Sequence, residues 1–338
     1  MKEFLKIALA VVAVALITAF VIYYIIYLKP NGDYKKNLSK LKIQPAGAKI
    51  NQQKDCIHFL KTGSSDAILI ESQGHYALVD CAEDSDNPRN FPALEFKGYE
   101  QEVLDYLKKN CAADDGKVYL DFVLGTHAHS DHIGGFDTVI ADDDIVISRA
   151  YLKRYDESKI NSHEVEDWDN KEVYEQMLNA LNSKGIPVIA DITETEFKLG
   201  EFNIKLYNTE YDTVNDITGE NDNSIGVLVE KGGKKAFLAA DIDNKTGDED
   251  RLGPQIGKVD ILKVGHHSYS GSTTAKWLKT LMPEVCVVTN DYERTDRQTL
   301  RRITRITHAP ILDTGTNNGV LCVFENDGTI SYYNNICE

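Results

Sequence analysis

The stretch Gly125–Gly135 reads GTHAHSDHIGG and begins at the end of the apolar segment DFVLG, which predicts a buried strand. Within six residues it holds three histidines and one aspartate in the order H-x-H-x-D-H. Imidazole and carboxylate groups together are typical ligands of zinc, iron or manganese. With nine histidines and 53 acidic residues in 338 positions, this pattern arises by chance in about one such chain in a thousand. The stretch therefore predicts a metal site at the end of a strand.

The spacing within this stretch predicts two ions. His127 and His129 point to the same side if the chain is still extended, so they are expected to share one ion. Asp131 and His132 lie past the turn and can face a second ion. The two glycines that follow allow the backbone to bend tightly around the metals.

The overall composition is that of a globular protein with an acidic surface. The net charge is −16, and beyond residue 30 the chain has 34 basic and 52 acidic residues, a net −18. Such a body is a poor general partner for nucleic acid or anionic lipid. No C-x-x-C pair occurs, which argues against a zinc ribbon or a thioredoxin-like site. The spacing assigns no disulfides among the six cysteines, Cys56, Cys81, Cys111, Cys286, Cys322 and Cys337.

The first 29 residues predict a transmembrane anchor. Ile7–Leu28 contains 22 residues without a charge, and a helix of this length measures about 33 Å, against about 30 Å for a hydrocarbon core. The alternative is a cleaved signal peptide, but the apolar run is longer than usual and ends in bulky residues. Lysines on both sides of the span leave its orientation open. Because a long domain can translocate regardless of such charges, we expect a single-pass protein of the cell membrane with an extracytoplasmic catalytic domain.

Residues 30–54 are polar and lysine-rich and predict a linker, and residues 55–338 predict one domain. In this domain many short apolar segments bounded by turn residues, among them Tyr119–Gly125, suggest strands. Helical patterns come between them at irregular intervals, which suits two mixed sheets with helices packed outside. These patterns are Glu100–Lys109, Lys171–Asn182, Thr274–Leu281 and Thr295–Thr307.

The H-x-H-x-D-H motif after a strand resembles the metallo-β-lactamase superfamily, an α/β (α+β) fold with a four-layer αββα sandwich and metals at one sheet edge. The resemblance covers most of residues 55–335. IHFLKTGSSDAILIES followed by YALVDC resembles the opening strands of the branch that contains the ComEC-like hydrolase domain and the phosphorylcholine esterases. NDNSIGVLV, KKAFLAADID and VDILKVGHHSYSGSTT resemble that branch in order and spacing, and GVLCVFENDGTISYY resembles its closing hairpin.

The resemblance implies further site residues. Asp241, at the end of the FLAAD strand, would bridge both metals, although a strand-terminal aspartate alone more often caps a turn. His266 would be the last ligand, on the ion held by Asp131 and His132, and His267 a catalytic or substrate-contacting group, with the reverse order left open. Asp80, at the end of YALVD, would orient the metal loop, because ligating histidines usually need such a partner.

One departure from the superfamily concerns the first ion. Many members supply another histidine between the first motif and the bridging aspartate, where this chain offers Asn221 and Asn223. A weaker ligand or water would then complete the His127/His129 site. Such a substitution is usual in the ComEC-like branch and counts against glyoxalase, lactonase and β-lactamase activities.

The resulting hypothesis is a metal-dependent phosphodiesterase with two divalent ions, zinc first and manganese or iron as alternatives. A metal-bridging hydroxide would attack the ester, and Asp131 would take or return a proton. The loop HSYSGSTT offers Ser270 and Ser272 to phosphate oxygens, unless it is an ordinary turn. The alternatives are a ComEC-like nuclease, a hydrolase of another ester or amide class, and a non-catalytic membrane-tethered binding module.

A nucleic-acid substrate is not favoured. Arg297, Arg301 and Arg305 form a stripe at helical spacing that could contact a phosphate backbone. Such a stripe is more often a solvated helix face, and the acidic body opposes polyanions. A phosphodiester of the cell envelope, such as a choline-phosphate headgroup, is the other substrate class.

Overall fold

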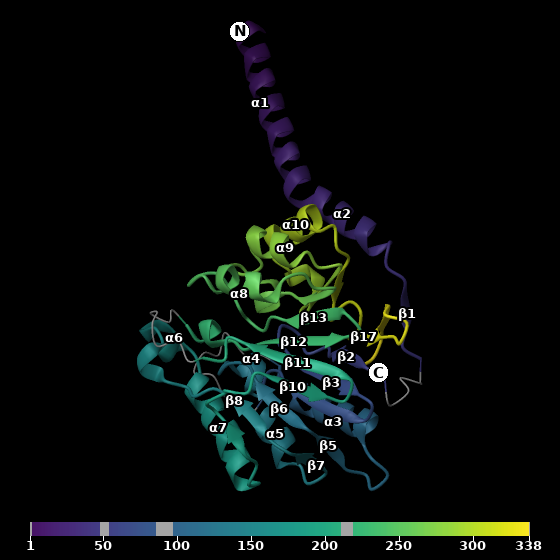
Figure 1. Cartoon of the computed structure of the whole chain (residues 1–338). Helices are drawn as coiled ribbons and strands as arrows, with labels where there is room; N and C mark the ends of the chain where they lie inside the picture. Colours follow the sequence, from purple (N-terminus) through teal and green to yellow (C-terminus); the bar gives the residue numbers. More distant parts are fainter. Residues whose placement is uncertain (1, 48–53, 86–96, 211–218, 338) are drawn as a thin grey trace.

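The computed structural model describes residues 2–47, 54–85, 97–210 and 219–337 (Figure 1). Two large sheets face each other. One has nine strands in the order β1-β18-β17-β2-β3-β4-β6-β8-β9, and the other has seven in the order β10-β11-β12-β13-β14-β15-β16. Two further strands, β5 (Val118–Leu120) and β7 (Ile145–Ile147), pair with each other at the side.

The strands of the nine-stranded sheet are β1 (Ile43–Pro45), β2 (Cys56–Phe59), β3 (Ile68–Ser72), β4 (His75–Val79), β6 (Phe122–Gly125), β8 (Ala150–Leu152), β9 (Val188–Ile189), β17 (Val320–Phe324) and β18 (Ile330–Asn334). Those of the seven-stranded sheet are β10 (Glu196–Leu199), β11 (Phe202–Tyr207), β12 (Gly226–Lys231), β13 (Lys234–Leu238), β14 (Ile261–Lys263), β15 (Val285–Val288) and β16 (Ile311–Asp313). The α-helices are α1 (Lys2–Tyr23), α2 (Lys29–Leu38), α3 (Glu100–Cys111), α4 (Ser130–Ile133), α5 (Phe136–Ala141), α6 (Ser162–Asp167), α7 (Asn170–Ser183), α8 (Asp248–Ile256), α9 (Ala275–Leu281) and α10 (Arg297–Ile306).

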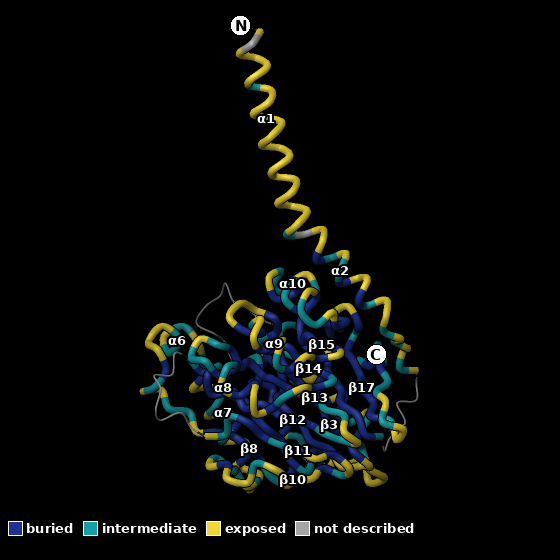
Figure 2. The backbone as a smooth tube through the Cα atoms, turned by 45° about the horizontal axis from the view of Figure 1, so that its top comes forward, coloured by how far each residue is buried: buried dark blue, intermediate teal, exposed yellow. Residues whose placement is uncertain are grey.

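Apolar side chains fill three layers between these elements. One cluster lies between the two sheets and includes Ile57 and Phe202. A second lies between the nine-stranded sheet and the helices α3, α5 and α7, and a third between the seven-stranded sheet and α8, α9 and α10. Central strands such as β2, β3, β6 and β14 are accordingly buried along their whole length, and Figure 2 shows the interior of the domain in dark blue. This is the predicted αββα sandwich.

The carboxyl ends of parallel strands bring the motif residues together. β4 and β6 are parallel neighbours in one sheet, and β13 and β14 are parallel neighbours in the other. The loops after these four strands carry Asp80, the His127–His132 motif, Asp241 and His266–His267. Because the loops meet at one edge of the sandwich, segments more than a hundred residues apart can form one site.

The N-terminal helix leaves the domain and has its apolar residues in the open. α1 continues through a π-helical turn, Tyr24–Leu28, into α2, and Phe4–Leu38 is long and apolar enough to cross a membrane (Figure 1). Large apolar side chains of α1, such as Phe4, Ile17 and Phe20, are exposed, and Figure 2 draws this helix mainly in yellow. A membrane span and a signal sequence both fit these properties.

The segment expected to be a linker is folded against the domain over much of its length. α2 packs on α10, and the ring of Tyr34 stacks on Tyr292 with centroids 4.2 Å apart. The Tyr34 hydroxyl donates to Asp313 Oδ2 at 3.5 Å, and the Tyr292 hydroxyl donates to Asn31 Oδ1 at 2.6 Å. β1 then pairs in parallel with β18. Residues 48–53 lie outside the described residues.

Two local features differ from the sequence-based expectation. Tyr119–Gly125 was expected to be one strand, but Asp121 divides it, so that β5 pairs with β7 and β6 joins the large sheet. The helix α8 was not expected, because its sequence DEDRLGPQI contains glycine and proline, which are unfavourable inside helices.

Candidate metal centre

Four side chains converge where the two sheets meet, and we call them the inner cluster: Asp131, His132, Asp241 and His267. His132 Nε2 lies 3.1 Å from His267 Nε2 and 3.2 Å from Asp241 Oδ1. His267 Nε2 lies 3.3 Å from Asp241 Oδ1 and 3.4 Å from Asp131 Oδ2. Nitrogen and oxygen ligands at about 2.0–2.1 Å around a tetrahedral zinc ion are about 3.3 Å apart. The inner cluster therefore has the donor atoms and the spacing of a divalent metal site.

His127 and His129 form a second group beside it, the outer pair. His127 Nε2 and His129 Nδ1 lie 3.1 Å apart. Asp241 turns its other oxygen, Oδ2, toward His127 Nε2 at 4.0 Å. One carboxylate thus presents Oδ1 to the inner cluster and Oδ2 to the outer pair, which is the arrangement expected of a bridging ligand.

The two adjacent histidines after β14 point in different directions. His266 and His267 have φ values of 51° and 47°, and Ser268 follows at 68°. Non-glycine residues in this left-handed region cost about 1–3 kcal/mol each, so such a run is typical of functional sites. His267 is fully buried in the inner cluster, whereas the His266 side chain is 23% exposed. His266 Nε2 lies 3.8 Å from Asp241 Oδ2, on the oxygen that faces the outer pair.

The environments of these two imidazoles differ accordingly. Burial lowers the pKa of His266 to about 4, with only partial compensation by Asp241. Burial also acts on His267, but the carboxylates of Asp241 and Asp66 raise its pKa to about 9. His267 is therefore the histidine held among carboxylates, whereas the resemblance favoured His266 as the ligand and left the reverse order open.

Asp80 holds the metal loop as expected of an orienting carboxylate. Its Oδ1 accepts from the Thr126 amide at 2.8 Å, and its Oδ2 accepts from the Thr126 hydroxyl at 2.8 Å. Asp80 Oδ2 also lies 2.7 Å from His132 Nδ1. With Nδ1 engaged in this way, Nε2 of His132 faces the inner cluster.

Glu164 orients the outer pair in a similar way, which the sequence did not predict. Its Oε1 lies 2.9 Å from His129 Nε2 and accepts from the Glu220 amide at 2.9 Å. The indole of Trp168 stacks on the His129 ring with centroids 5.4 Å apart. Glu164 lies in a polar stretch of α6, and its sequence surroundings give no signal of this role.

Asp66 and Lys263 form a buried ion pair behind the inner cluster, also without having been anticipated. Both side chains are fully buried, and Lys263 Nζ donates to the Ala240 carbonyl at 2.8 Å. Asp66 Oδ1 lies 3.4 Å from His267 Nδ1, and Lys263 Nζ lies 3.8 Å from Asp241 Oδ1. Burial by itself would raise the pKa of Asp66, but Lys263 and His267 hold it well below its usual value. The sequence signal was a lysine inside the apolar strand VDILKVG.

The remaining candidates have mixed positions. Asn221 Nδ2 lies 3.4 Å from His266 Nε2, beside the outer pair. Asn223 is buried and donates to Glu220 Oε2 instead. Ser272 is buried and donates to the Gly265 carbonyl at 2.8 Å, so its hydroxyl supports the loop, while Ser270 is exposed.

The family follows from a profile described as the beta-lactamase superfamily domain, which matches residues 77–272 and so includes every ligand candidate. The chain belongs to the metallo-β-lactamase superfamily. Members of this superfamily are generally hydrolases, and its fold implies binding of divalent metal.

Curated relatives support the ComEC-like branch. The chain is 26% identical over 226 residues to ComE operon protein 3 of Bacillus subtilis, covering 63% of this chain and 26% of that protein. It is 23% identical over 193 residues to Recombination protein 2 of Haemophilus influenzae, covering 56% and 19%. The chain thus spans about a quarter or less of these relatives.

Solved structures with the same kind of fold include the metallo-beta-lactamase fold protein YhfI of Bacillus subtilis, with a TM-score of 0.48 and 12% identity over 82% of this chain and 98% of that one. Zn(2+)-bound PqqB from Methylobacterium extorquens has a TM-score of 0.42 at 12% identity, covering 73% and 85%. The short form of human tRNase Z has a TM-score of 0.41 at 14% identity, covering 76% and 95%.

Proposed function

We propose that this chain is a membrane-anchored phosphodiesterase that works with two divalent metal ions. The observation that carries the proposal is Asp241, whose two oxygens face two separate sets of nitrogen ligands. Two ions held about 3.5–4 Å apart lower the pKa of a shared water and stabilise the attacking and leaving oxygens of a displacement. Zinc is the metal we favour, because the donor set contains both imidazole and carboxylate.

The ligand assignment in this proposal follows the geometry. Asp131, His132 and His267 would hold one ion and His127 and His129 the other, with Asp241 contributing one oxygen to each. Burial lowers the pKa of His127 well below its ordinary value, so that this imidazole is neutral and its lone pair is available to a metal.

His266 has a different part, beside the outer pair and partly open to solvent. Its low pKa keeps it neutral at pH 7, so it can accept a hydrogen bond or supply the outer ion with a nitrogen that replaces the histidine missing from this chain. Asn221, the residue that stands near that missing position, is its neighbour.

Asp131 is proposed to take or return the proton of the attacking water. Its Oδ2 faces His267, while its Oδ1 is buried and has no hydrogen-bond partner among the described residues. A carboxylate with one oxygen in the inner cluster and the other unengaged can hold a proton without leaving its position.

For the substrate, we favour an envelope phosphodiester over nucleic acid. The arginines of α10 line a groove together with Ile26, at the base of the apolar helix. There they are suited to lipid phosphates at the membrane surface. The body remains acidic, which opposes binding of a polyanion. Similarity to ComE operon protein 3 keeps a nuclease as the second candidate.

The test uses the full-length protein in detergent. We expect about two metal equivalents in the main site and hydrolysis of bis(p-nitrophenyl) phosphate that a chelator abolishes and added zinc restores. His127→Ala should remove activity, and His163→Ala, a change at an exposed histidine outside the site, should not. Inactive, metal-free protein would favour a binding module, and preferred cleavage of a β-lactam or thioester would place the substrate in another class.

A further inference from the structure

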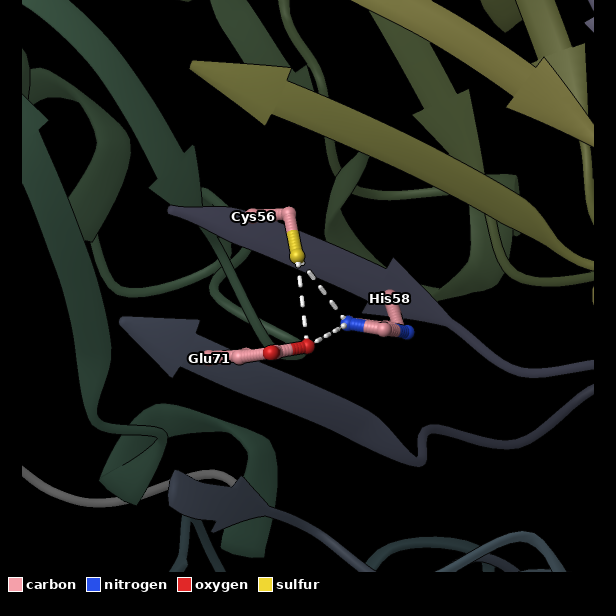
Figure 3. Close-up of side chains that lie close together, drawn as sticks. All are labelled: Cys56, His58 and Glu71. Atoms are coloured by element: carbon pink, nitrogen blue, oxygen red, sulfur yellow. Dashed lines mark hydrogen bonds and ion pairs between the residues drawn. The ribbon is translucent and has the colours of Figure 1, made fainter. Parts of the chain in front are cut away.

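A second cluster of metal-ligand side chains lies on the face of the nine-stranded sheet that α3 covers, separate from the centre described above. Cys56 and His58 alternate along β2 and so share one face, and Glu71 on β3 pairs with Cys56. Figure 3 shows the three side chains pointing toward one another. Cys56 and His58 are fully buried and Glu71 is 3% exposed.

The distances within this triangle suit a metal ion. Cys56 Sγ lies 3.2 Å from His58 Nε2 and 3.5 Å from Glu71 Oε2, and His58 Nε2 lies 3.2 Å from Glu71 Oε2. For a tetrahedral zinc ion with bonds of about 2.3 Å to sulfur and about 2.0–2.1 Å to nitrogen and oxygen, the edges that include sulfur are about 3.5 Å and the other is about 3.3 Å. All three edges agree with these values to within a few tenths of an ångström.

Hydrogen bonds alone account for the triangle less well. With Glu71 ionised, Sγ and Nε2 carry at most one proton each, so two protons serve three edges. If both are directed to Glu71 Oε2, sulfur and nitrogen remain 3.2 Å apart without a proton between them. A cation at the centre satisfies all three atoms at once.

The surroundings orient His58 as they would a ligand. The Tyr106 hydroxyl of α3 lies 2.8 Å from His58 Nδ1, which directs Nε2 and its lone pair into the triangle. Both Cys56 and Glu71 therefore meet the same nitrogen. A catalytic thiol–imidazole–carboxylate triad would instead place them on opposite nitrogens and would be open to substrate.

Charge also balances around a divalent ion. A thiolate and a carboxylate together neutralise two positive charges, so the complex with neutral His58 has no net charge in the apolar core. Burial and Glu71 raise the pKa of the Cys56 thiol well above its usual value, so metal binding would displace a proton from it.

We propose that Cys56, His58 and Glu71 bind a structural zinc ion that joins β2 to β3 beneath α3. Because the ligands lie inside the core, the ion would enter during folding and remain closed off from substrate. This site is independent of the proposed hydrolytic centre, which contains no sulfur ligand.

Cobalt substitution tests the proposal through that difference. Full-length protein produced in cobalt-supplemented medium should show a near-ultraviolet charge-transfer band from sulfur to cobalt, because Cys56 would be a thiolate ligand. Cys56→Ser should lose the band and one metal equivalent. Cys286→Ser, a change at a buried cysteine in the other sheet, should keep both.

The wild-type spectrum decides the matter even if Cys56→Ser fails to fold. A cobalt-loaded wild type without the band, or a folded Cys56→Ser protein that retains it, would overturn the proposal. Glu71→Gln provides a second variant, which keeps the thiol and should lower the cobalt content of this site. Hydrolysis of bis(p-nitrophenyl) phosphate, measured separately, reports only on the centre around Asp241.

Discussion

Replacing Lys263 with methionine is expected to lower the free energy of unfolding by about 3–5 kcal/mol. Lys263 and Asp66 are fully buried and form an ion pair, and Lys263 also donates to the Ala240 carbonyl. Methionine occupies a similar volume but has no charge and no donor. The Asp66 carboxylate would then remain in the core without its cation, which is the costly way to break a buried pair.

The measurement is urea denaturation of the full-length protein in detergent, followed by fluorescence. Trp277 is a suitable reporter because it is fully buried beside Phe237. A chelator is present throughout, since a metal bound only to the folded state would add to the stability. Asp66→Asn removes the stranded charge, so the double variant should recover at least about 1 kcal/mol relative to the sum of the single changes. A loss below about 1 kcal/mol in Lys263→Met, or simple additivity in the double variant, would refute this reasoning.

Three other expectations concern the metal site, its loop and the N-terminal segment. His267→Ala should lose one metal equivalent and lower kcat/KM by at least about 100-fold, whereas His266→Ala should keep the ion of the inner cluster. Equal metal loss from both variants would contradict the assignment of His267 as the ligand of that ion. Glu249 on α8 accepts from the Thr273 and Thr274 amides in the loop that follows His267, and burial raises its pKa from 4.5 to about 7. Between these pH values the folded state therefore retains a proton that the unfolded chain releases. The free energy of unfolding should therefore fall as the pH rises from about 4.5 to about 7, by up to about 1.4 kcal/mol per pH unit. Glu249→Gln should reduce that slope. If the free energy of unfolding of the two proteins had the same pH dependence, this role of Glu249 would be excluded. Tyr34→Ala should make residues 29–47 more sensitive to limited proteolysis, read by mass spectrometry, without loss of hydrolysis, and equal cleavage of the wild type would mean that α2 is not held.

The sequence predicted those parts of the structure that depend on local pattern. The H-x-H-x-D-H motif has strong ligand chemistry and little chance of arising at random, and the buried strands have clear apolar runs. The αββα architecture followed from these and from the resemblance. The resemblance also implied that Asp80, at the end of its strand, orients the metal loop.

What escaped prediction depends on contacts between distant segments. His266 and His267 point in different directions because they begin a run of three consecutive left-handed residues, a conformation that no pattern of side chains encodes. Glu164 reaches His129 across 35 positions, and Asp66 reaches Lys263 across almost two hundred. Cys56, His58 and Glu71 were not singled out from the sequence, because the register that brings them together exists only in the folded sheet.

The docking of α2 on α10 would have a consequence for the membrane-anchored enzyme proposed above. A free linker of 25 residues would have an end-to-end distance of about 25–30 Å, so the catalytic edge of the domain would lie at many different distances from the membrane surface. With Tyr34 stacked on Tyr292 and β1 paired with β18, the exit of the apolar helix is fixed to the body instead. The metal centre would then keep a fixed distance from the bilayer surface and a fixed orientation while the protein diffuses laterally. Its choice of substrate would then depend on how far a phosphodiester stands from the membrane as well as on its chemistry.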